Sequence, residues 1–421
     1  MDGHDGIPRA TVERHGDRRS GATVERRGER RSGATGGSDH GTPGSGPGDG
    51  PDERGHSPRT VDTDRRPFVL IWELTQACDL ACEHCRAEAE PERHPDELST
   101  AAGRALLDEV RRFGPNQLVV LSGGDPLYRD DTVELVEYGV DRGLAMTLTP
   151  SGTTSLTRSA IGALADAGLR RLALSIDGST PERHDAFRGE DGSFESTVRA
   201  AHHAADLGLP LQINTVVCAE TVGDLPLIAD LVGELEAVLW SVFFLVPVGR
   251  GECLEPISPP MAEEVMEWLV ELSDRAPFGI KTTEAPHYRR VALQRRSDPT
   301  VAGSGGPPDD VGRRTGILAG DGFAFVSHTG ELYPSGFLPV SAGNVREESV
   351  VELYRESGLF RRLRDRDRLR GKCGACEFRH VCGGSRSRAF AHAGDPLASD
   401  PLCAYVPSGY EGPLPRSPSA D

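Results

Sequence analysis

Seven of the nine cysteines in this 421-residue chain lie in two groups, and these are the residues with the clearest chemistry. The first group reads Cys-x3-Cys-x2-Cys, and the second reads Cys-x2-Cys-x5-Cys with one more cysteine further along the chain. The members are Cys78, Cys82 and Cys85 in the first group and Cys373, Cys376, Cys382 and Cys403 in the second. In a cytosolic protein, cysteines grouped in this way indicate metal or redox chemistry more often than disulfides.

The first group puts three thiolates on one loop. A 4Fe–4S cluster normally takes four cysteine ligands, so three thiolates would leave one iron open to another ligand. An open coordination position is typical of a catalytic rather than a structural metal site. A zinc site, or a cluster completed by a distant cysteine, would use the same residues. The four cysteines of the second group suit either a closed 4Fe–4S cluster or a four-thiolate zinc site.

The elements that must position these cysteines are short apolar runs that alternate with amphipathic segments. The runs predict strands over 68–75, 117–121, 145–149, 171–176, 211–217 and 238–246. Helices are predicted over 100–113, 130–142, from 157 onward, and over 194–207, 225–235 and 261–273. This alternation predicts an α/β fold with a parallel sheet, and six units in succession suit an open or partial barrel. Further on, 323–326 and 331–333 predict a β-hairpin, and 348–366 predicts a helix.

Polar segments follow four successive strands. The first cysteine group follows the first strand, and Ser122–Pro126 (SGGDP) follows the second. Pro150–Thr153 follows the third strand, and Ser175–Gly178 ends the fourth. Each segment alone would pass for an ordinary turn, but ligands bind at the carboxyl ends of parallel strands. The convergence therefore predicts one site at that edge of the sheet, where the glycines would let a ligand approach the backbone.

The cysteine loop after the first strand, together with the GGDP segment after the second, resembles the radical S-adenosylmethionine (SAM) superfamily. The resemblance covers about residues 67–405, because the second cysteine group is similar to the SPASM or twitch auxiliary domain of that family. It implies a partial (β/α)6 TIM barrel. It also implies an oxidoreductase that reductively cleaves SAM to methionine and a 5′-deoxyadenosyl radical, which abstracts a substrate hydrogen. The implied cofactors are a SAM-ligating 4Fe–4S cluster, SAM, and a second, auxiliary 4Fe–4S cluster.

The resemblance also implies roles for individual residues. The first three cysteines would ligate three irons, and the amino and carboxylate groups of SAM would chelate the fourth. The implied SAM contacts are Gly123, Gly124, Asp125, Pro126, Ser151, Ser175, Asp177 and Arg188. Asp125 stands where the family has Glu, and Ser151 stands where relatives often have Asn. His84 is expected to pack near the cluster, and no residue is assigned as a catalytic acid or base.

The second group lacks two cysteines of a full SPASM domain. The usual run would place one of them at Arg386, and relatives often have the other at Ser335. We therefore expect one auxiliary cluster, held by the four cysteines of the second group, and not two.

Composition divides the chain and excludes some functions. The predicted organisation is a disordered tail over 1–66, a radical SAM core over 67–295, a linker or loop over 296–320, an auxiliary cluster domain over 321–405 and a disordered tail over 406–421. The predicted tail over 1–66 has no Phe, Trp or Tyr to bury. The net charge of −18 argues against nucleic-acid binding. No apolar run is long enough for a membrane span and no signal peptide begins the chain, which predicts a cytoplasmic protein.

The expected substrate comes from a narrower resemblance. Leu121–Leu127, Phe337–Pro339 and Gly343–Arg346 look like segments of the branch that contains heme-pathway enzymes. This likeness implies a tetrapyrrole substrate, with oxidative decarboxylation of the propionates of Fe-coproporphyrin III as the leading candidate. A maturase of ribosomally made peptides is the alternative within the family. A non-catalytic iron–sulfur electron carrier is the alternative from another class.

The resemblance to radical SAM enzymes implies a protein partner, a low-potential electron donor such as ferredoxin or flavodoxin, that would reduce the cluster. A substrate with several carboxylates would also need cations inside the barrel. The candidates for that role are Arg289, Arg290, Arg295 and Arg296.

Overall fold

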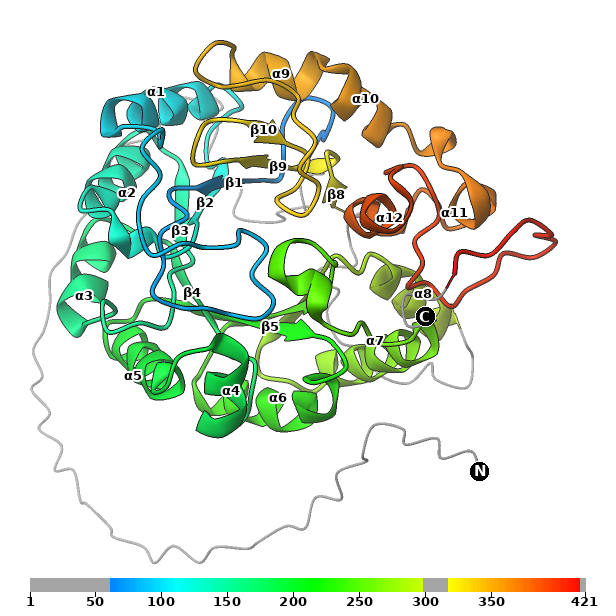
Figure 1. The fold of residues 1–421 in the computed structure, drawn as a ribbon, viewed down its shortest axis with the longest axis horizontal. Coiled ribbons are helices and arrows are strands. Elements are labelled where there is room, and N and C mark those ends of the chain that lie inside the picture. Colours follow the sequence, from blue (N-terminus) through cyan, green and yellow to red (C-terminus); the bar gives the residue numbers. More distant parts are fainter. Residues whose placement is uncertain (1–60, 298–316, 417–421) are drawn as a thin grey trace, which may run out of the picture. The chain divides into compact units, whose positions relative to one another are not determined.

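The computed structural model describes residues 61–297 and 317–416, and one sheet runs through this part of the chain (Figure 1). The sheet has ten strands in the order β10-β9-β1-β2-β3-β4-β5-β6-β7, and β8 pairs with β9. The strands are β1 Val69–Glu73, β2 Leu118–Ser122, β3 Ala145–Leu148, β4 Arg171–Ser175, β5 Leu211–Val217, β6 Leu239–Phe244, β7 Gly279–Thr283, β8 Leu318–Ala319, β9 Gly322–Val326 and β10 Leu332–Tyr333. Because β1 to β7 are parallel neighbours, the predicted α/β barrel-type fold is confirmed.

The helices that connect the parallel strands lie outside the ring of strands (Figure 1). The α-helices are α1 Thr100–Arg111, α2 Thr132–Asp141, α3 Arg158–Asp166, α4 Pro181–Arg188, α5 Ser193–Asp206, α6 Leu225–Glu234, α7 Pro259–Ser273, α8 His287–Ser297, α9 Val350–Glu356, α10 Gly358–Arg364, α11 Gly371–Ala375 and α12 Arg386–Ala393. Short 3-10 helices are η1 Pro126–Tyr128, η2 Val222–Asp224, η3 Gly249–Cys253 and η4 Arg366–Arg368.

The alternation of side chains along each strand explains this layering. In β1, Leu70 and Trp72 are fully buried, whereas Ile71 points to the opposite face and keeps partial exposure. Gly103 of α1 permits close contact with β1, because a Cβ at this position would lie 2.4 Å from the Trp72 ring. The outer face of the sheet and the apolar faces of the helices thus form one core.

Three features were not predicted from the sequence. Strand β7 has one strongly apolar residue, Ile280, and so gives a weak pattern. Strand β9 pairs with β10 as the predicted hairpin, but it also pairs in parallel with β1 and extends the barrel sheet. The helix predicted over 348–366 is interrupted at Ser357, whose backbone is extended and whose hydroxyl caps α10.

The structure describes parts of the two segments that the sequence predicts to be disordered tails. Residues 61–66, at the end of the first predicted tail, lie against α9, where the hydroxyl of Tyr354 donates to the carbonyl of Thr63 (2.6 Å). Residues 406–416 form neither helix nor strand. The rest of the predicted tails and most of the predicted linker lie outside the described residues. In the part of the chain that the structure describes, no helix has both the length and the apolar character to cross a bilayer.

Candidate functional site

The first cysteine group lies on the loop that leaves β1. Cys78 and Cys82 are buried, Cys85 is half-buried, and all three are free thiols packed with Leu80 and Ala89. The sulfur of Cys78 accepts from the backbone N–H of Leu80, and the sulfur of Cys85 accepts from that of Ala89, both at 3.4 Å. Burial raises the pKa of the Cys78 thiol to about 11, so metal binding must displace a proton there.

The GGDP segment after β2 holds this cysteine loop by its backbone. The N–H of Gly124 donates to the carbonyl of Thr75 (2.8 Å), and the N–H of Asp125 donates to that of Ala77 (2.7 Å). A Cβ on Gly124 would lie 2.3 Å from the Ala77 oxygen. The glycine was expected to let a ligand approach, and the structure shows that the chain's own cysteine loop makes the close approach.

Asp125 is fully buried within the same segment. Its carboxylate accepts from the N–H of Leu127 (3.1 Å) and from the hydroxyl of Thr153 (3.0 Å). Burial raises its pKa. Asp125 therefore caps η1, which begins at Pro126, and joins the end of β2 to the loop after β3.

Ser151, after β3, connects the GGDP segment to the cysteine loop. Its hydroxyl lies 3.2 Å from the sulfur of Cys78 and donates to the carbonyl of Gly124 at 2.9 Å. The departure from the family's usual Asn thus leaves a polar side chain that contacts a cysteine sulfur directly.

The end of β4 contributes an ion pair beside the cysteines. Nη2 of Arg188 lies 2.5 Å from Oδ2 of Asp177, and Nη1 of Arg188 lies 3.7 Å from the sulfur of Cys82. Burial by itself would raise the pKa of Asp177, but the Arg188 charge, the nearby histidines and the N–H of Val216 together outweigh it, so the pKa is lowered. The Nε of Arg188 is buried without a hydrogen-bond partner among the described residues. Ser175 is half-buried at the last position of β4.

His84 packs beside the cysteines, as predicted. Its ring stacks on Phe187, with centroids 4.8 Å apart and planes 9° apart. Burial and the nearby Arg188 charge lower its pKa to about 4. The four strand-end segments thus meet at one place, and the proposed SAM contacts after β2, β3 and β4 surround the first cysteine group.

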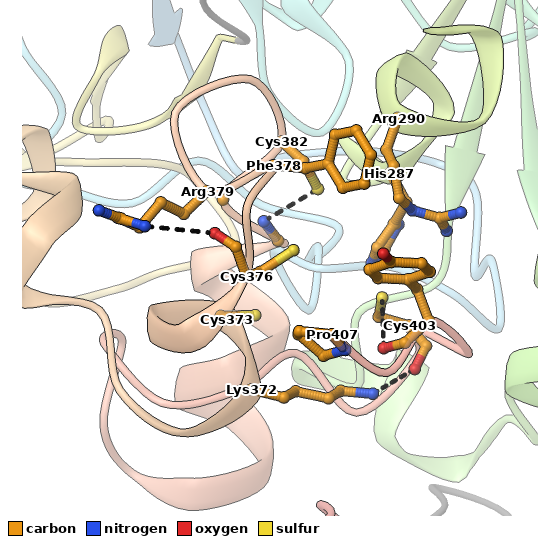
Figure 2. A pocket seen from close by; sticks show the side chains of 13 residues that line it. His287, Arg290, Lys372, Cys373, Cys376, Phe378, Arg379, Cys382, Cys403 and Pro407 are labelled. Atoms are coloured by element: carbon orange, nitrogen blue, oxygen red, sulfur yellow. Dashed lines mark hydrogen bonds between the residues drawn. The ribbon is translucent and has the colours of Figure 1, made fainter. Parts of the chain in front are cut away.

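The second cysteine group surrounds a pocket. Cys373, Cys376, Cys382 and Cys403 all line it, and Figure 2 shows their sulfur atoms around one space. Arg290, Lys372 and His287 are among the other lining residues. Burial raises the pKa of Cys403 to about 12. As placed, no three His, Cys, Asp or Glu side chains of the described residues could hold a metal ion.

Hydrogen-bond donors point at the sulfur atoms of this pocket. The sulfur of Cys382 accepts from the N–H of Gly384 (3.4 Å), and the sulfur of Cys373 accepts from that of Asp400 (3.4 Å). Nη2 of Arg386 lies 3.7 Å from the same Cys373 sulfur. N–H···S bonds to thiolates are a regular feature of iron–sulfur sites, so the donor set fits a cluster.

Arg386 and Ser335, the two positions where cysteines are missing, have other partners. Arg386 is fully buried and donates to backbone carbonyls, including those of Pro396 and Ala398, both at 2.8 Å. The hydroxyl of Ser335 donates to Glu284 at 3.2 Å.

The cations proposed on α8 are engaged by glutamates of α7. Arg290 pairs with Glu263 at 2.5 Å, and Arg295 pairs with Glu267 at 2.9 Å. Arg290 also lines the pocket of the second cysteine group. The side chain of Arg296 lies outside the described residues. For Arg290 and Arg295 the expectation of cations available to a substrate was wrong, because both are already neutralised by the neighbouring helix.

A buried network that the sequence did not reveal connects the second group to the barrel. Arg388 donates to the carbonyls of Phe244 and Leu245 at the end of β6, both at 3.0 Å. It also pairs with Asp400 (3.2 Å), which contacts His287 at 2.9 Å. All three side chains are nearly inaccessible. No motif identifies such a network, because its members are far apart in the sequence.

Three comparisons report the known proteins that this chain resembles. A model of the radical SAM superfamily matches residues 72–232. The chain is 40% identical over 358 residues to the AdoMet-dependent heme synthase of Nitratidesulfovibrio vulgaris, which covers 84% of this chain and 96% of that protein. It is 32% identical over 353 residues to the PqqA peptide cyclase of Rhizobium meliloti. This match covers 83% of this chain and 90% of that protein. Streptococcus suis SuiB bound to S-adenosylmethionine has a similar fold, with a TM-score of 0.63 and 17% identity over 81% of this chain and 78% of that one.

Proposed function

This chain belongs to the radical SAM superfamily and is a SAM-dependent enzyme, and we propose that it converts Fe-coproporphyrin III to heme. The reaction would be the oxidative decarboxylation of two propionate side chains to vinyl groups. The observation that carries this proposal is the 40% identity to an AdoMet-dependent heme synthase over 96% of that protein's length.

The first cysteine group fits the SAM-ligating 4Fe–4S cluster of this family. Cys78, Cys82 and Cys85 would hold three irons and leave the fourth for SAM. When bound, the cluster and SAM supply a 5′-deoxyadenosyl radical that abstracts a hydrogen atom from the substrate. The chain itself holds the cysteine loop through the N–H groups of Gly124 and Asp125, and it buries Cys78 and Cys82.

Arg188 is the residue best placed to contact SAM. Asp177 holds its guanidinium beside Cys82, and the buried Nε is an unused donor. A carboxylate is the acceptor that suits a guanidinium donor best. Ser151 and Ser175 add hydroxyl groups at the neighbouring strand ends.

The second cysteine group would hold one auxiliary 4Fe–4S cluster through Cys373, Cys376, Cys382 and Cys403. Loss of a hydrogen atom and of carbon dioxide from a propionate leaves one electron that must be accepted. An auxiliary cluster supplies a one-electron acceptor of this kind. Arg388 would keep the pocket in a constant position relative to the ends of β6.

The test is anaerobic turnover. The protein is reconstituted with iron and sulfide, and about eight irons per chain are expected for two 4Fe–4S clusters. Dithionite, SAM and Fe-coproporphyrin III are then added, and 5′-deoxyadenosine, carbon dioxide and heme are measured. Formation of all three supports the proposal. About four irons with zinc would contradict the auxiliary cluster.

A second candidate function is the maturation of a ribosomally made peptide. The observation that favours it is the 32% identity to a PqqA peptide cyclase. Formation of 5′-deoxyadenosine without turnover of the tetrapyrrole, together with modification of a precursor peptide, would favour this candidate. A chain that carries clusters but forms no 5′-deoxyadenosine would instead be an electron carrier.

A further inference from the structure

The strands β4 to β7 carry a row of polar side chains on the inner face of the sheet. Their other face carries core residues such as Leu172, Ile213 and Trp240, and successive side chains of a strand alternate between faces. The inner polar row consists of Arg171, Ser175, Gln212, Asn214, Ser241, Lys281 and Thr283. The parallel register places Ser175 beside Asn214, Asn214 beside Ser241, and Ser241 beside Lys281.

The inner face on the other side of the barrel is mainly apolar. Ile71 of β1 and Val120 of β2 are paired in register there. Phe325 of β9 and Tyr333 of β10 stack with their centroids 6.3 Å apart. The inner face of the barrel therefore has a mainly apolar half and a half that carries the inner polar row. Ala173, Val216, Leu239 and Phe243 alternate onto the same face as this row.

Arg171 is the most informative member of the inner polar row. It is half-buried, and Nη1 donates to Oε1 of Gln212 at 3.2 Å, while Nε2 of Gln212 donates to Oδ1 of Asn214 at 2.7 Å. Burial and the adjacent charge of Arg170 lower its pKa. Among the described residues, no carboxylate lies within 4.0 Å of this guanidinium. A partly desolvated cation held by neutral amides is a favourable partner for an anionic ligand.

Hydroxyl groups continue the inner polar row on β6 and β7. The hydroxyl of Ser241 lies 3.3 Å from that of Thr283, and the register places Ser241 beside Lys281. The guanidinium of Arg171 and several neutral groups thus line one side of the barrel interior.

We propose that the inner polar row binds the carboxylates that the reaction leaves intact, with Arg171 as their cationic partner. This inference rests on the proposed function, in which a substrate with four carboxylates loses two. The two carboxylates that survive lie on the edge of the macrocycle opposite the two that react. From Arg171 to Ser175, β4 extends ~13 Å, which is comparable to the breadth of such a macrocycle. One edge of the ring then lies by the strand ends near Cys78 and the opposite edge reaches Arg171, while the apolar half of the inner face contacts the ring.

Binding is tested without turnover. Fe-coproporphyrin III is titrated into the reconstituted full-length protein, without reductant, and followed by its visible absorption. The variant Arg171→Met is expected to weaken binding about 10- to 100-fold, the usual effect of removing one charge-assisted hydrogen bond. Arg171→Lys keeps the charge and is expected to weaken binding less than Arg171→Met. Arg170→Met is the matched control, because Arg170 is the exposed neighbour outside the row, and it should bind as the parent does.

Two further ligands separate the possible outcomes. Heme retains only the surviving carboxylates, so its binding should be weakened by Arg171→Met as strongly as that of Fe-coproporphyrin III. Iron etioporphyrin has no carboxylate, so parent and variant should bind it equally. Equal binding of heme by parent and Arg171→Met, or an equal loss in Arg170→Met, would overturn the inference while leaving the proposed function intact. If the parent binds no tetrapyrrole, the proposed function itself fails. Iron content and circular dichroism show whether each variant is folded.

Discussion

Arg386 directs a guanidinium N–H at the sulfur of Cys373, with 3.7 Å between Nη2 and Sγ. Arg386 occupies a position where a full SPASM run would have a cysteine, and its side chain is fully buried. The first cysteine group has the same feature, because Nη1 of Arg188 lies 3.7 Å from the sulfur of Cys82. Each group therefore pairs one buried guanidinium with one thiolate ligand of its proposed cluster.

This contact should control the reduction potential of the auxiliary cluster. A positive charge and a hydrogen bond at a ligand sulfur stabilise the reduced, more negative form. We expect Arg386→Gln to lower the midpoint potential by on the order of 50 mV, since a tenfold change in a one-electron equilibrium is 59 mV. The measurement is a redox titration followed by electron paramagnetic resonance.

The matched control for this prediction is Arg379→Gln. Arg379 also lines the pocket, but it contacts the carbonyl of Cys376 and not a sulfur atom. An equal shift in both variants would mean that overall charge, and not the N–H···S contact, sets the potential. Arg386→Lys keeps the charge and provides a measurable protein if Arg386→Gln does not fold.

Loss of any cysteine of the first group should remove one cluster and all SAM cleavage. Cys78→Ala, Cys82→Ala and Cys85→Ala are each expected to lose about four irons per chain and to form no 5′-deoxyadenosine. The auxiliary cluster should remain, because the cysteines of the second group line a separate pocket. Cys218→Ala is the control, since this buried cysteine belongs to neither group and its loss should leave the iron content unchanged. Full iron content in Cys82→Ala would contradict the ligand assignment.

Asp177 should be needed to keep Arg188 in place. Asp177→Asn removes the carboxylate 2.5 Å from the guanidinium and leaves a buried charge without its partner, which costs about 3–5 kcal/mol in comparable pairs. We expect weaker SAM binding and a loss of 5′-deoxyadenosine formation of at least about tenfold. Asp185→Asn is the control, because Asp185 lies on the helix of Arg188 (α4) but accepts from the backbone N–H groups of Gly192 and Phe194 instead. Unchanged SAM affinity in Asp177→Asn would argue against the proposed role of the pair.

His184 should make the fold sensitive to mild acid. Burial, followed by the Arg188 charge, lowers its pKa from 6.5 to about 4, while its Nδ1 accepts from the N–H of Asp177 (3.2 Å). Between about pH 4 and pH 6.5, His184 binds a proton in the unfolded chain but not in the folded chain. The free energy of unfolding should therefore fall as pH falls through this window, by up to ~1.4 kcal/mol per pH unit. Chemical denaturation of His184→Asn should show a smaller slope, and an identical slope would refute the assignment.

The strand pattern and the first cysteine loop were predictable because their signals are local. Cys78, Cys82 and Cys85 lie within one loop, and runs such as that around Val119 show their burial directly in the sequence. The parallel pairing of β9 with β1 was not predictable, because it joins Phe323 to Val69 across most of the chain.

The sequence did not show which charged side chains are available at the site, and the reason is again that distant elements decide this. Arg290 and Arg295 of α8 were expected to serve a carboxylate substrate inside the barrel, but Glu263 and Glu267 of another helix neutralise them. Arg171 looks like an ordinary strand residue, and only the structure shows that its guanidinium donates to the side chain of Gln212 on β5. Contacts between distant elements decide which charges are available, and no local pattern records them.

The most direct test of the central claim is hydrogen transfer from the substrate. Fe-coproporphyrin III carrying deuterium at the propionate carbons next to the ring would be incubated with the reconstituted protein, SAM and dithionite under anaerobic conditions. Mass spectrometry would then follow 5′-deoxyadenosine and the tetrapyrrole. The account predicts one deuterium in 5′-deoxyadenosine for each carbon dioxide released, with heme as the product. Unlabelled 5′-deoxyadenosine and an intact tetrapyrrole would contradict it.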